Sequence, residues 1–131
     1  MIDRHDAHGV VLAGFMRVLA PVFIERFPNR ILNIHPSLLP AFPGTNAIEA
    51  ALRHPVKVTG VTVHFVDEKV DNGPIIAQVA VEVMDDDTVD SLHRRIQVEE
   101  HRLYPKVVEA FVAGQLEVVG RTVVTRAGAV R

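Results

Sequence analysis

The stretch Arg30–His35 reads RILNIH and runs directly into PSLLP, Pro36–Pro40; together they decide the fold. A short apolar run with β-branched residues predicts a buried strand, and the proline-rich segment after it predicts a loop. Upstream, Val10–Gly14 predicts another buried strand, and Ala20–Phe27 has the apolar spacing of a helix between the two. Two strands joined by one helical crossover predict a βαβ unit with a parallel sheet.

Downstream, the pattern predicts a short helix, two strands joined as an antiparallel hairpin, a long helix and a last edge strand. Thr45 is expected to cap the short helix, and Gly114 to stop the long one. The bounds are expected at Asn46–Arg53, Thr59–Val66, Ile75–Val83, about Val89–Ala113 and Leu116–Thr125. The fold class expected is α/β: a mainly parallel, twisted, Rossmann-like sheet flanked by helices, in one domain over residues 1–131.

Composition excludes several classes of function. The chain has 131 residues and a formal charge of −2 without a basic cluster, which argues against binding to nucleic acid or to an anionic membrane. Its most apolar stretch, Gly9–Phe23, is interrupted by Arg17 and Pro21, so no membrane-spanning segment is expected. The absence of cysteine excludes disulfides, thiolate metal sites and cysteine nucleophiles, and fits a cytoplasmic location.

Asn33 and His35 form the first candidate site. Residues two apart in a strand point to the same face, so both side chains should project together from the carboxyl end of a parallel strand. Open α/β sheets place their active sites at such ends. Because prolines 36, 40 and 43 each restrict φ, the following loop should be stiff enough to hold side chains in register.

Asp71 is the second candidate. It lies in Val70–Ile76, at the expected hairpin tip, between two apolar strands. Taken alone, an Asp-Asn-Gly run is fully explained as a turn former. The run gains significance only in combination with the strand-end Asn33 and His35.

Five segments in order resemble the folate-dependent formyltransferase family. They are Leu12–Leu19, Asn33–Gly44, Gly60–Val66, Asp71–Ile76, and Glu100-His101 with Tyr104-Pro105. The resemblance implies transfer of a formyl group from 10-formyltetrahydrofolate to the amino group of glycinamide ribonucleotide, a step of purine biosynthesis. It also implies the family's α/β fold, with the folate as co-substrate and without a metal.

The resemblance makes Asn33, His35 and Asp71 the catalytic set. The Asn33 amide and a protonated His35 would donate to the oxyanion that forms when an amine attacks the formyl carbon. Asp71 would hold the imidazole, raise its pKa and join it in a proton relay. His64, by contrast, is expected to fill space or to support the catalytic side chains from behind, rather than to act in catalysis itself.

The resemblance also implies binding segments. Folate contacts are expected from Asn33 and from two stretches, Met16, Arg17, Val18 and Leu19, and Asp67, Glu68, Lys69, Val70 and Asp71. Ribonucleotide contacts are expected from Gln97, Val98, Glu99 and Glu100. Without the resemblance, the first stretch reads as an ordinary helix start and the last as a solvated helix face.

The chain departs from the family before the Val10 strand. The family has an additional amino-terminal region there, with a glycine-rich loop for the ribonucleotide phosphate, whereas the eight glycines here form no Gly-x-Gly-x-x-Gly pattern. We therefore expect the carboxy-terminal part of a formyltransferase domain, lacking the phosphate-binding portion. An open sheet edge should favour self-association, which leaves a homodimer open, and formyl transfer should be weak.

Three other functions stay open on the sequence. A formyltetrahydrofolate deformylase shares the Asn-x-His and Asp pattern but gives the formyl group to water; Pro36 and Phe42-Pro43-Gly44 favour the transferase. A methionyl-tRNA formyltransferase would need basic surface. A non-catalytic folate-binding module would retain the binding segments without turnover.

Overall fold

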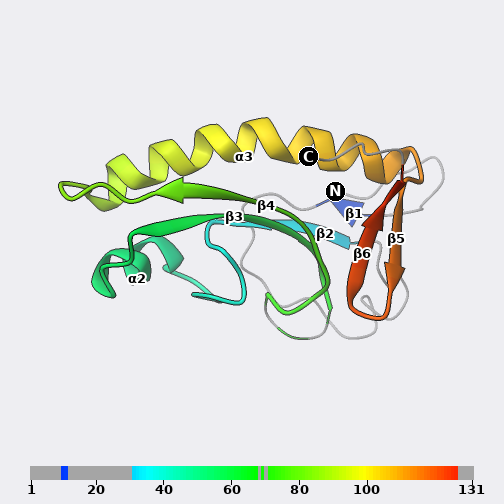
Figure 1. The fold of residues 1–131 in the computed structure, drawn as a ribbon, viewed down its shortest axis with the longest axis horizontal. Coiled ribbons are helices and arrows are strands. Elements are labelled where there is room, and N and C mark those ends of the chain that lie inside the picture. The colour runs from blue at the N-terminus through cyan, green and yellow to red at the C-terminus, as the bar shows by residue number, and fades with distance from the viewer. Residues whose placement is uncertain (1–9, 12–30, 68, 70, 127–131) are drawn as a thin grey trace.

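The computed structural model describes residues 10–11, 31–67, 69 and 71–126 (Figure 1). The expected helix Ala20–Phe27 and most of the strand Val10–Gly14 lie outside the described residues. None of the described helices has the length and apolar character needed to cross a membrane.

A four-stranded sheet forms the centre of the described fold, in the order β1 (Val10–Val11), β2 (Ile31–His35), β3 (Val58–Phe65) and β4 (Ile75–Glu82). β1 and β2 are parallel and β3–β4 is an antiparallel hairpin, both as expected, and β2–β3 is also antiparallel. The described strands therefore hold the parallel pair and the hairpin of the predicted α/β fold, with one more antiparallel pairing than the sequence indicated. The short 66–74 connection forces β4 to run back along β3, since a parallel pair needs a longer crossover.

The two faces of this sheet differ in chemistry. On β2 and β3 every second residue is apolar, and these residues pack beneath the long helix α3 (Val89–Val112), which lies along the sheet (Figure 1). The buried core comprises Leu32, Ile34, Val61, Val63, Phe65, Val81, Leu92, Ile96, Leu103, Val107 and Ala110. The opposite face of these strands carries the buried polar side chains of Asn33, His35, Thr62 and His64, which form a polar layer.

Helix α3 agrees with its predicted bounds. Thr88 caps its first turn: the Thr88 hydroxyl accepts from the Ser91 N–H, and the Ser91 hydroxyl accepts from the Thr88 N–H. The helix ends before Gly114, whose φ of 71° suits glycine in the left-handed region. The helix therefore offers its apolar stripe to the sheet along its whole length.

The short helix α2 spans Ala47–Arg53, but its predicted cap is wrong. Asn46, not Thr45, is the N-cap residue; its φ is 61°, and its side chain makes no capping hydrogen bond. The chain turns through left-handed conformations at Gly44 and Asn46, which moves the helix start one residue along from the predicted position.

The predicted edge strand Leu116–Thr125 is also corrected. It is a separate hairpin of β5 (Leu116–Val119) and β6 (Thr122–Thr125), because Gly120, with φ of 65°, allows a tight turn in the middle of the run. At this turn Arg121 donates to the Asn72 carbonyl, so the hairpin supports the turn that carries Asp71.

Candidate active site

The polar face of the sheet brings together four buried side chains from β2 and β3. Asn33 lies opposite His64, and His35 lies opposite Thr62, in the antiparallel register. Directly opposed residues in an antiparallel pair project to the same face. Asn33 and His35 therefore share one side of β2, as their spacing predicts, and His64 and Thr62 extend the same layer.

Asp71 enters this layer from the turn between β3 and β4. Its own backbone adopts φ of 50°, and the Gly44 N–H donates to its Oδ2 at 2.7 Å. Gly73 does not have a positive φ; a Cβ atom there would lie 1.7 Å from the Phe65 carbonyl oxygen. The glycine is thus needed because two backbone segments meet, rather than for the turn conformation that an Asn-Gly pair normally indicates.

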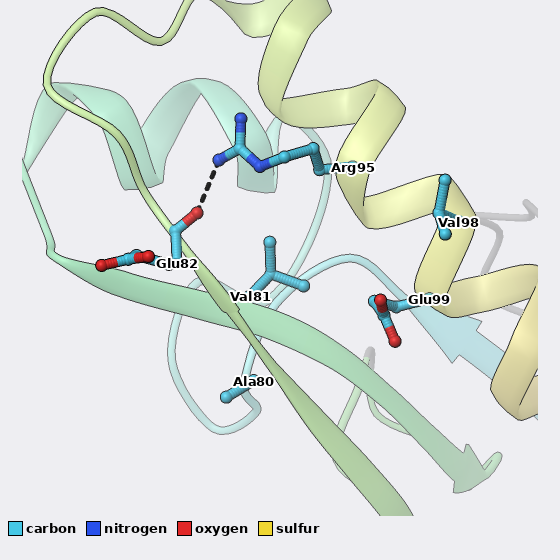
Figure 2. A pocket seen from close by; sticks show the side chains of 6 residues that line it. All are labelled: Ala80, Val81, Glu82, Arg95, Val98 and Glu99. Atoms are coloured by element: carbon cyan, nitrogen blue, oxygen red, sulfur yellow. Dashed lines mark hydrogen bonds between the residues drawn. The ribbon is translucent and has the colours of Figure 1, made fainter.

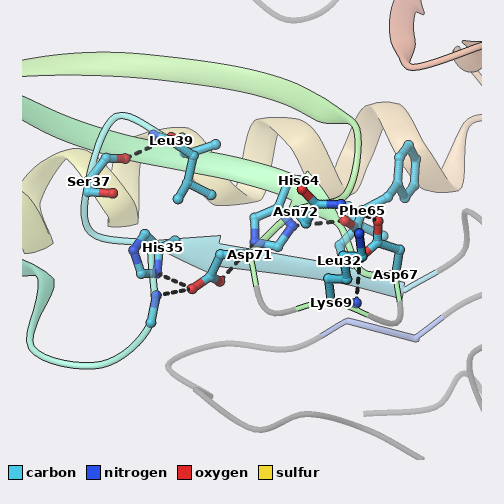
Figure 3. Close-up of polar contacts among 12 residues, drawn as sticks. Leu32, His35, Ser37, Leu39, His64, Phe65, Asp67, Lys69, Asp71 and Asn72 are labelled. Atoms are coloured by element: carbon cyan, nitrogen blue, oxygen red, sulfur yellow. Dashed lines mark hydrogen bonds and ion pairs between the residues drawn. The ribbon is translucent and has the colours of Figure 1, made fainter. Parts of the chain in front are cut away.

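The Asp71 carboxylate lies between two imidazole rings (Figure 3). His35 Nδ1 is 3.4 Å from Oδ2, and His64 Nε2 is 3.5 Å from Oδ1. All three side chains are almost inaccessible to solvent. The structure thus brings together the predicted pair of His35 and Asp71 and places His64 against Asp71, where the sequence analysis expected it to fill space or to support the catalytic side chains.

Backbone carbonyls fix the tautomers of both rings. His35 Nε2 is 2.8 Å from the Phe42 carbonyl oxygen, and His64 Nδ1 is 2.8 Å from the Phe65 carbonyl oxygen. Since a carbonyl only accepts, both of these nitrogens carry hydrogen. In neutral rings, the nitrogens that face Asp71 are then without hydrogen, so a hydrogen bond to the carboxylate requires one additional proton in the cluster.

Burial sets the charge of His35. Desolvation lowers the pKa of His35 below its ordinary value, outweighing the Phe42 carbonyl and the Asp71 carboxylate, which raise it. Asp71 thus raises the pKa of His35 as expected, but burial lowers it further, so the neutral ring is favoured over the charged form that the sequence suggested. Burial raises the pKa of Asp71, but the hydrogen bonds from His64 and Gly44 bring it below its ordinary value, and the carboxylate stays ionised.

The predicted folate segments are only partly described, because residues 16–19, 68 and 70 lie outside the described residues. Asp67 accepts from the Lys69 N–H at 2.9 Å and from the Asn72 amide at 3.1 Å. These bonds close the turn on which Asp71 stands (Figure 3). Asp67 thus ties Lys69 and Asn72 together beside Asp71.

The predicted ribonucleotide segment divides between two flanks of α3, because helical residues three or four apart share a face. Val98 and Glu99 line a pocket of about 330 Å³ with Arg95 and the end of β4 (Figure 2). Gln97 and Glu100 lie on the flank of Tyr104, whose hydroxyl donates to the Leu32 carbonyl of β2. The four residues therefore face two sides of the helix, and burial raises the pKa of Glu100 on its flank.

Within the described ranges, no group of three or more His, Cys, Asp or Glu side chains is arranged to hold a metal ion. What the cluster can do chemically is to accept, hold and return one proton between two imidazoles and a carboxylate. The amide of Asn33, on the same face, adds a neutral donor beside them.

Comparisons with known proteins agree with this geometry. A family model described as formyl transferase matches residues 1–108. The chain is 53% identical over 118 residues to a phosphoribosylglycinamide formyltransferase of Mycobacterium tuberculosis (strain H37Rv), covering 90% of this chain and 55% of the relative. The corresponding protein of Escherichia coli (strain K12) is 44% identical over 116 residues, covering 88% of this chain and 55% of the relative.

A solved structure of glycinamide ribonucleotide transformylase 1 from Symbiobacterium toebii matches with a TM-score of 0.87 and 55% identity, over 91% of this chain and 56% of that one. A formyltetrahydrofolate deformylase from Pseudomonas syringae matches with a TM-score of 0.86 but 32% identity, over 92% of this chain and 41% of that one. The chain thus spans about half the length of the curated relatives that it matches.

Proposed function

Because the chain belongs to the formyl transferase family, we propose that it transfers a formyl group from 10-formyltetrahydrofolate to the amine of glycinamide ribonucleotide. The observation that carries the proposal is the buried Asp71 carboxylate between His35 and His64, at 3.4 and 3.5 Å. The names and identities of the relatives favour this acceptor over water, since the deformylase is the less similar match.

In the proposed reaction the neutral amine attacks the formyl carbon, and an oxyanion develops on the formyl oxygen. The Asn33 amide donates to that oxygen; one well-placed donor commonly contributes about 3–4 kcal/mol to the transition state. His35 acts as a neutral imidazole, because burial lowers its pKa. This assignment replaces the imidazolium donor that the sequence suggested.

Proton movement completes the proposed step. The amine loses a proton as the new C–N bond forms, and the folate nitrogen gains one as the old C–N bond breaks. The cluster of His35, Asp71 and His64 has room for one additional proton between the carboxylate and the rings. It takes the proton from the amine and returns it to the folate nitrogen, so that no net proton, metal or covalent enzyme intermediate is needed.

The remaining assignments are proposals on the same basis. Residues 1–131 form a formyltransferase domain in the cytoplasm, and Met16–Leu19, Asn33 and Asp67–Asp71 contact the folate. Gln97 and Glu100 contact the ribonucleotide, because they share the flank of α3 that reaches β2 through Tyr104. Val98 and Glu99 contact it from the other flank of α3, where they line the pocket beside β4. Self-association into a homodimer also stays a proposal.

One assay tests the reaction and its nearest alternatives. The purified protein is incubated with 10-formyltetrahydrofolate, with and without glycinamide ribonucleotide, and loss of the formyl donor is followed. Loss that depends on the ribonucleotide supports the transferase. Loss without it identifies a deformylase, and no loss with measurable folate binding identifies a non-catalytic binding module.

A further inference from the structure

A row of polar side chains, buried at His35 and Thr62 and exposed at Gln78, crosses the sheet behind the candidate active site. Thr62 of β3 lies opposite His35 of β2 on one side and opposite Gln78 of β4 on the other. Opposed residues share a face, so the three side chains project into the same layer. The row links the outer strand β4 to the strand that carries His35.

The Thr62 hydroxyl is fully used by this layer. It donates to the Ser37 carbonyl at 2.7 Å and accepts from the Leu39 N–H at 3.0 Å and from the Gln78 amide at 2.9 Å. A hydroxyl has one donor and two acceptor positions, so Thr62 satisfies its complete hydrogen-bonding capacity. The side chain is 0% exposed, which makes each lost bond costly because no water replaces it.

The same bonds fasten the loop that follows β2 onto the sheet. The Gln78 amide donates to the Leu39 carbonyl at 2.9 Å as well as to Thr62. Leu38 packs over Gly60, where an added Cβ would lie 2.6 Å from a Leu38 methyl carbon. Polar side chains therefore hold the loop on the sheet, and the absence of a side chain at Gly60 lets Leu38 approach the strand closely.

The docked loop in turn contacts His35 through the Phe42 carbonyl. The Ser37 hydroxyl donates to the Ala41 carbonyl at 2.6 Å and lies 3.3 Å from the Phe42 carbonyl oxygen. That Phe42 oxygen accepts from His35 Nε2 at 2.8 Å, and Phe42 itself has a φ of 50°, unusual for a bulky residue. The tautomer of His35 thus depends on a strained carbonyl whose position the loop determines.

We propose that Thr62 and Gln78 are positioning residues, which dock the Ser37–Phe42 loop and thereby hold the His35 ring in one orientation and one tautomer toward Asp71. Neither residue is placed against a reacting atom. The catalytic part of the proposal rests on the proposed function, whereas the orientation of His35 is measurable without it.

The test uses three substitutions in one strand. Thr62→Val keeps the shape and removes the hydroxyl, and Thr62→Ser restores it. Thr59→Val is the matched control, since Thr59 is a buried threonine of β3 on the opposite face, whose hydroxyl has no hydrogen-bond partner among the described residues.

We expect Thr62→Val to lower kcat of formyl transfer about 10- to 100-fold, the cost of a misplacement near 1 Å. Thr62→Ser should recover to within about threefold, with KM changed little, as for an interaction made in the transition state.

The second readout is nuclear magnetic resonance of the His35 ring nitrogens in the same variants. The wild-type protein and Thr59→Val should show the Nε2–H tautomer and a His35 pKa below 6.5. Thr62→Val should show mixed tautomers and a pKa closer to 6.5, because the loosened loop admits water. This readout decides the proposal even if the protein transfers no formyl group, in which case only the proposed function fails.

Several results would overturn the positioning role. These are Thr62→Val with wild-type kcat and wild-type ring signals, equal losses in Thr62→Val and Thr59→Val, or no recovery in Thr62→Ser. If Thr62→Val does not fold, Gln78→Met takes its place, because Gln78 is an exposed position on the outer strand. Gln78→Met should lower kcat about 3- to 10-fold, a smaller part of the same misplacement effect. It should also perturb the His35 signals, and an unchanged His35 spectrum would refute the proposal.

Discussion

His64 Nε2 lies 3.5 Å from Asp71 Oδ1, about as close as His35 Nδ1 lies to the other carboxylate oxygen. The two rings are therefore near-equivalent neighbours of one acid, although only His35 stands in the strand-end motif. When His64 carries the additional proton, its Nε2 donates to Asp71; this hydrogen bond lowers the pKa of the carboxyl and so helps to keep it ionised inside the fold.

His64→Leu should therefore lower kcat about 10- to 100-fold and change its pH dependence. Losing the His64 hydrogen bond removes a cause that lowers the pKa of Asp71, so this pKa rises. The acidic limb of the kcat profile should then move to higher pH. His101→Gln, at an exposed histidine of α3, serves as the control. If the acidic limb of the kcat profile does not shift in His64→Leu, His64 only fills space beside Asp71.

His35→Ala and Asp71→Asn should each reduce formyl transfer at least about a hundredfold, within the range of general acid–base groups. Folate affinity should change little, because the two side chains exchange protons rather than supply most of the binding contacts. Single-turnover rates together with equilibrium binding of the folate separate the two effects. Near-normal turnover in either variant removes that residue from the mechanism.

Stability should depend on pH through His35. Its pKa is lowered in the folded chain from 6.5, so below pH 6.5 the unfolded chain binds more protons than the folded one. The free energy of unfolding should therefore decrease as pH falls below 6.5 and flatten once the folded-state pKa is passed. Urea unfolding of the wild type and of His35→Gln between about pH 5 and 8 checks this, because histidine titrates in roughly that pH range. A slope that is identical in both proteins would contradict it.

The strands and the long helix followed from the sequence because their patterns are local. The alternation in β3 and the apolar stripe of α3 each need only neighbouring residues to be recognised. The Thr45 cap failed because left-handed backbone at Asn46 depends on the preceding loop, and the hairpin β5–β6 was missed because Gly120 stands inside an apolar run.

The site was predictable in its members but not in its electrostatics. The spacing of Asn33 and His35 places them on one face, and the same alternation puts Thr62 and His64 on one face of β3, a signal that could have drawn attention to Thr62. The charge of His35 was not predictable, because desolvation depends on how the 36–44 loop and the Asp71 turn close over the ring. That closure is a tertiary property.

Asp87 and Arg95 offer a stability prediction away from the site. Arg95 donates to both Asp87 oxygens, at 2.7 and 2.6 Å, and the Met84 N–H and Ser91 hydroxyl donate to the same carboxylate. The Arg95 hydrogen bond holds the pKa of Asp87 well below its ordinary 3.8. Arg95 also donates to the Glu82 carbonyl, so one guanidinium joins the start of α3 to the end of β4.

Asp87→Asn should therefore lower the melting temperature at pH 7, because the carboxylate loses its charge-assisted hydrogen bonds from Arg95. Because the folded pKa is depressed, the contribution of Asp87 is fully present above pH 3.8 and is lost as pH falls further. The gap between wild type and Asp87→Asn should narrow in acid. The control is Asp85→Asn, whose carboxylate is 99% exposed and pairs with Lys57 at 3.7 Å. Such a surface ion pair contributes little to the free energy of unfolding. Equal changes of the melting temperature in Asp87→Asn and Asp85→Asn would refute the prediction.

Glu100 should lower the stability of the fold while it contributes to ligand binding. It is partly buried on α3 and makes no hydrogen bond or ion pair with any of the described residues. Burial raises its pKa above 4.5, although the charges of His93 and His101 act in the opposite direction. Keeping this carboxylate ionised at neutral pH thus costs folding free energy. Such a cost is typical of a binding-site residue whose hydrogen-bond partner is the ligand itself.

Glu100→Gln should consequently raise the melting temperature at pH 7, with the gain disappearing below pH 4.5, where glutamate is protonated in both states. If Glu100 contacts the ribonucleotide, the same variant should raise the KM for glycinamide ribonucleotide about 10- to 100-fold, as for loss of a hydrogen bond to a charged group. The KM for the folate should not change. Glu109→Gln, at an exposed position of the same helix, should alter neither quantity. A stabilised Glu100→Gln with an unchanged ribonucleotide KM would separate the buried charge from binding and remove Glu100 from the proposed site.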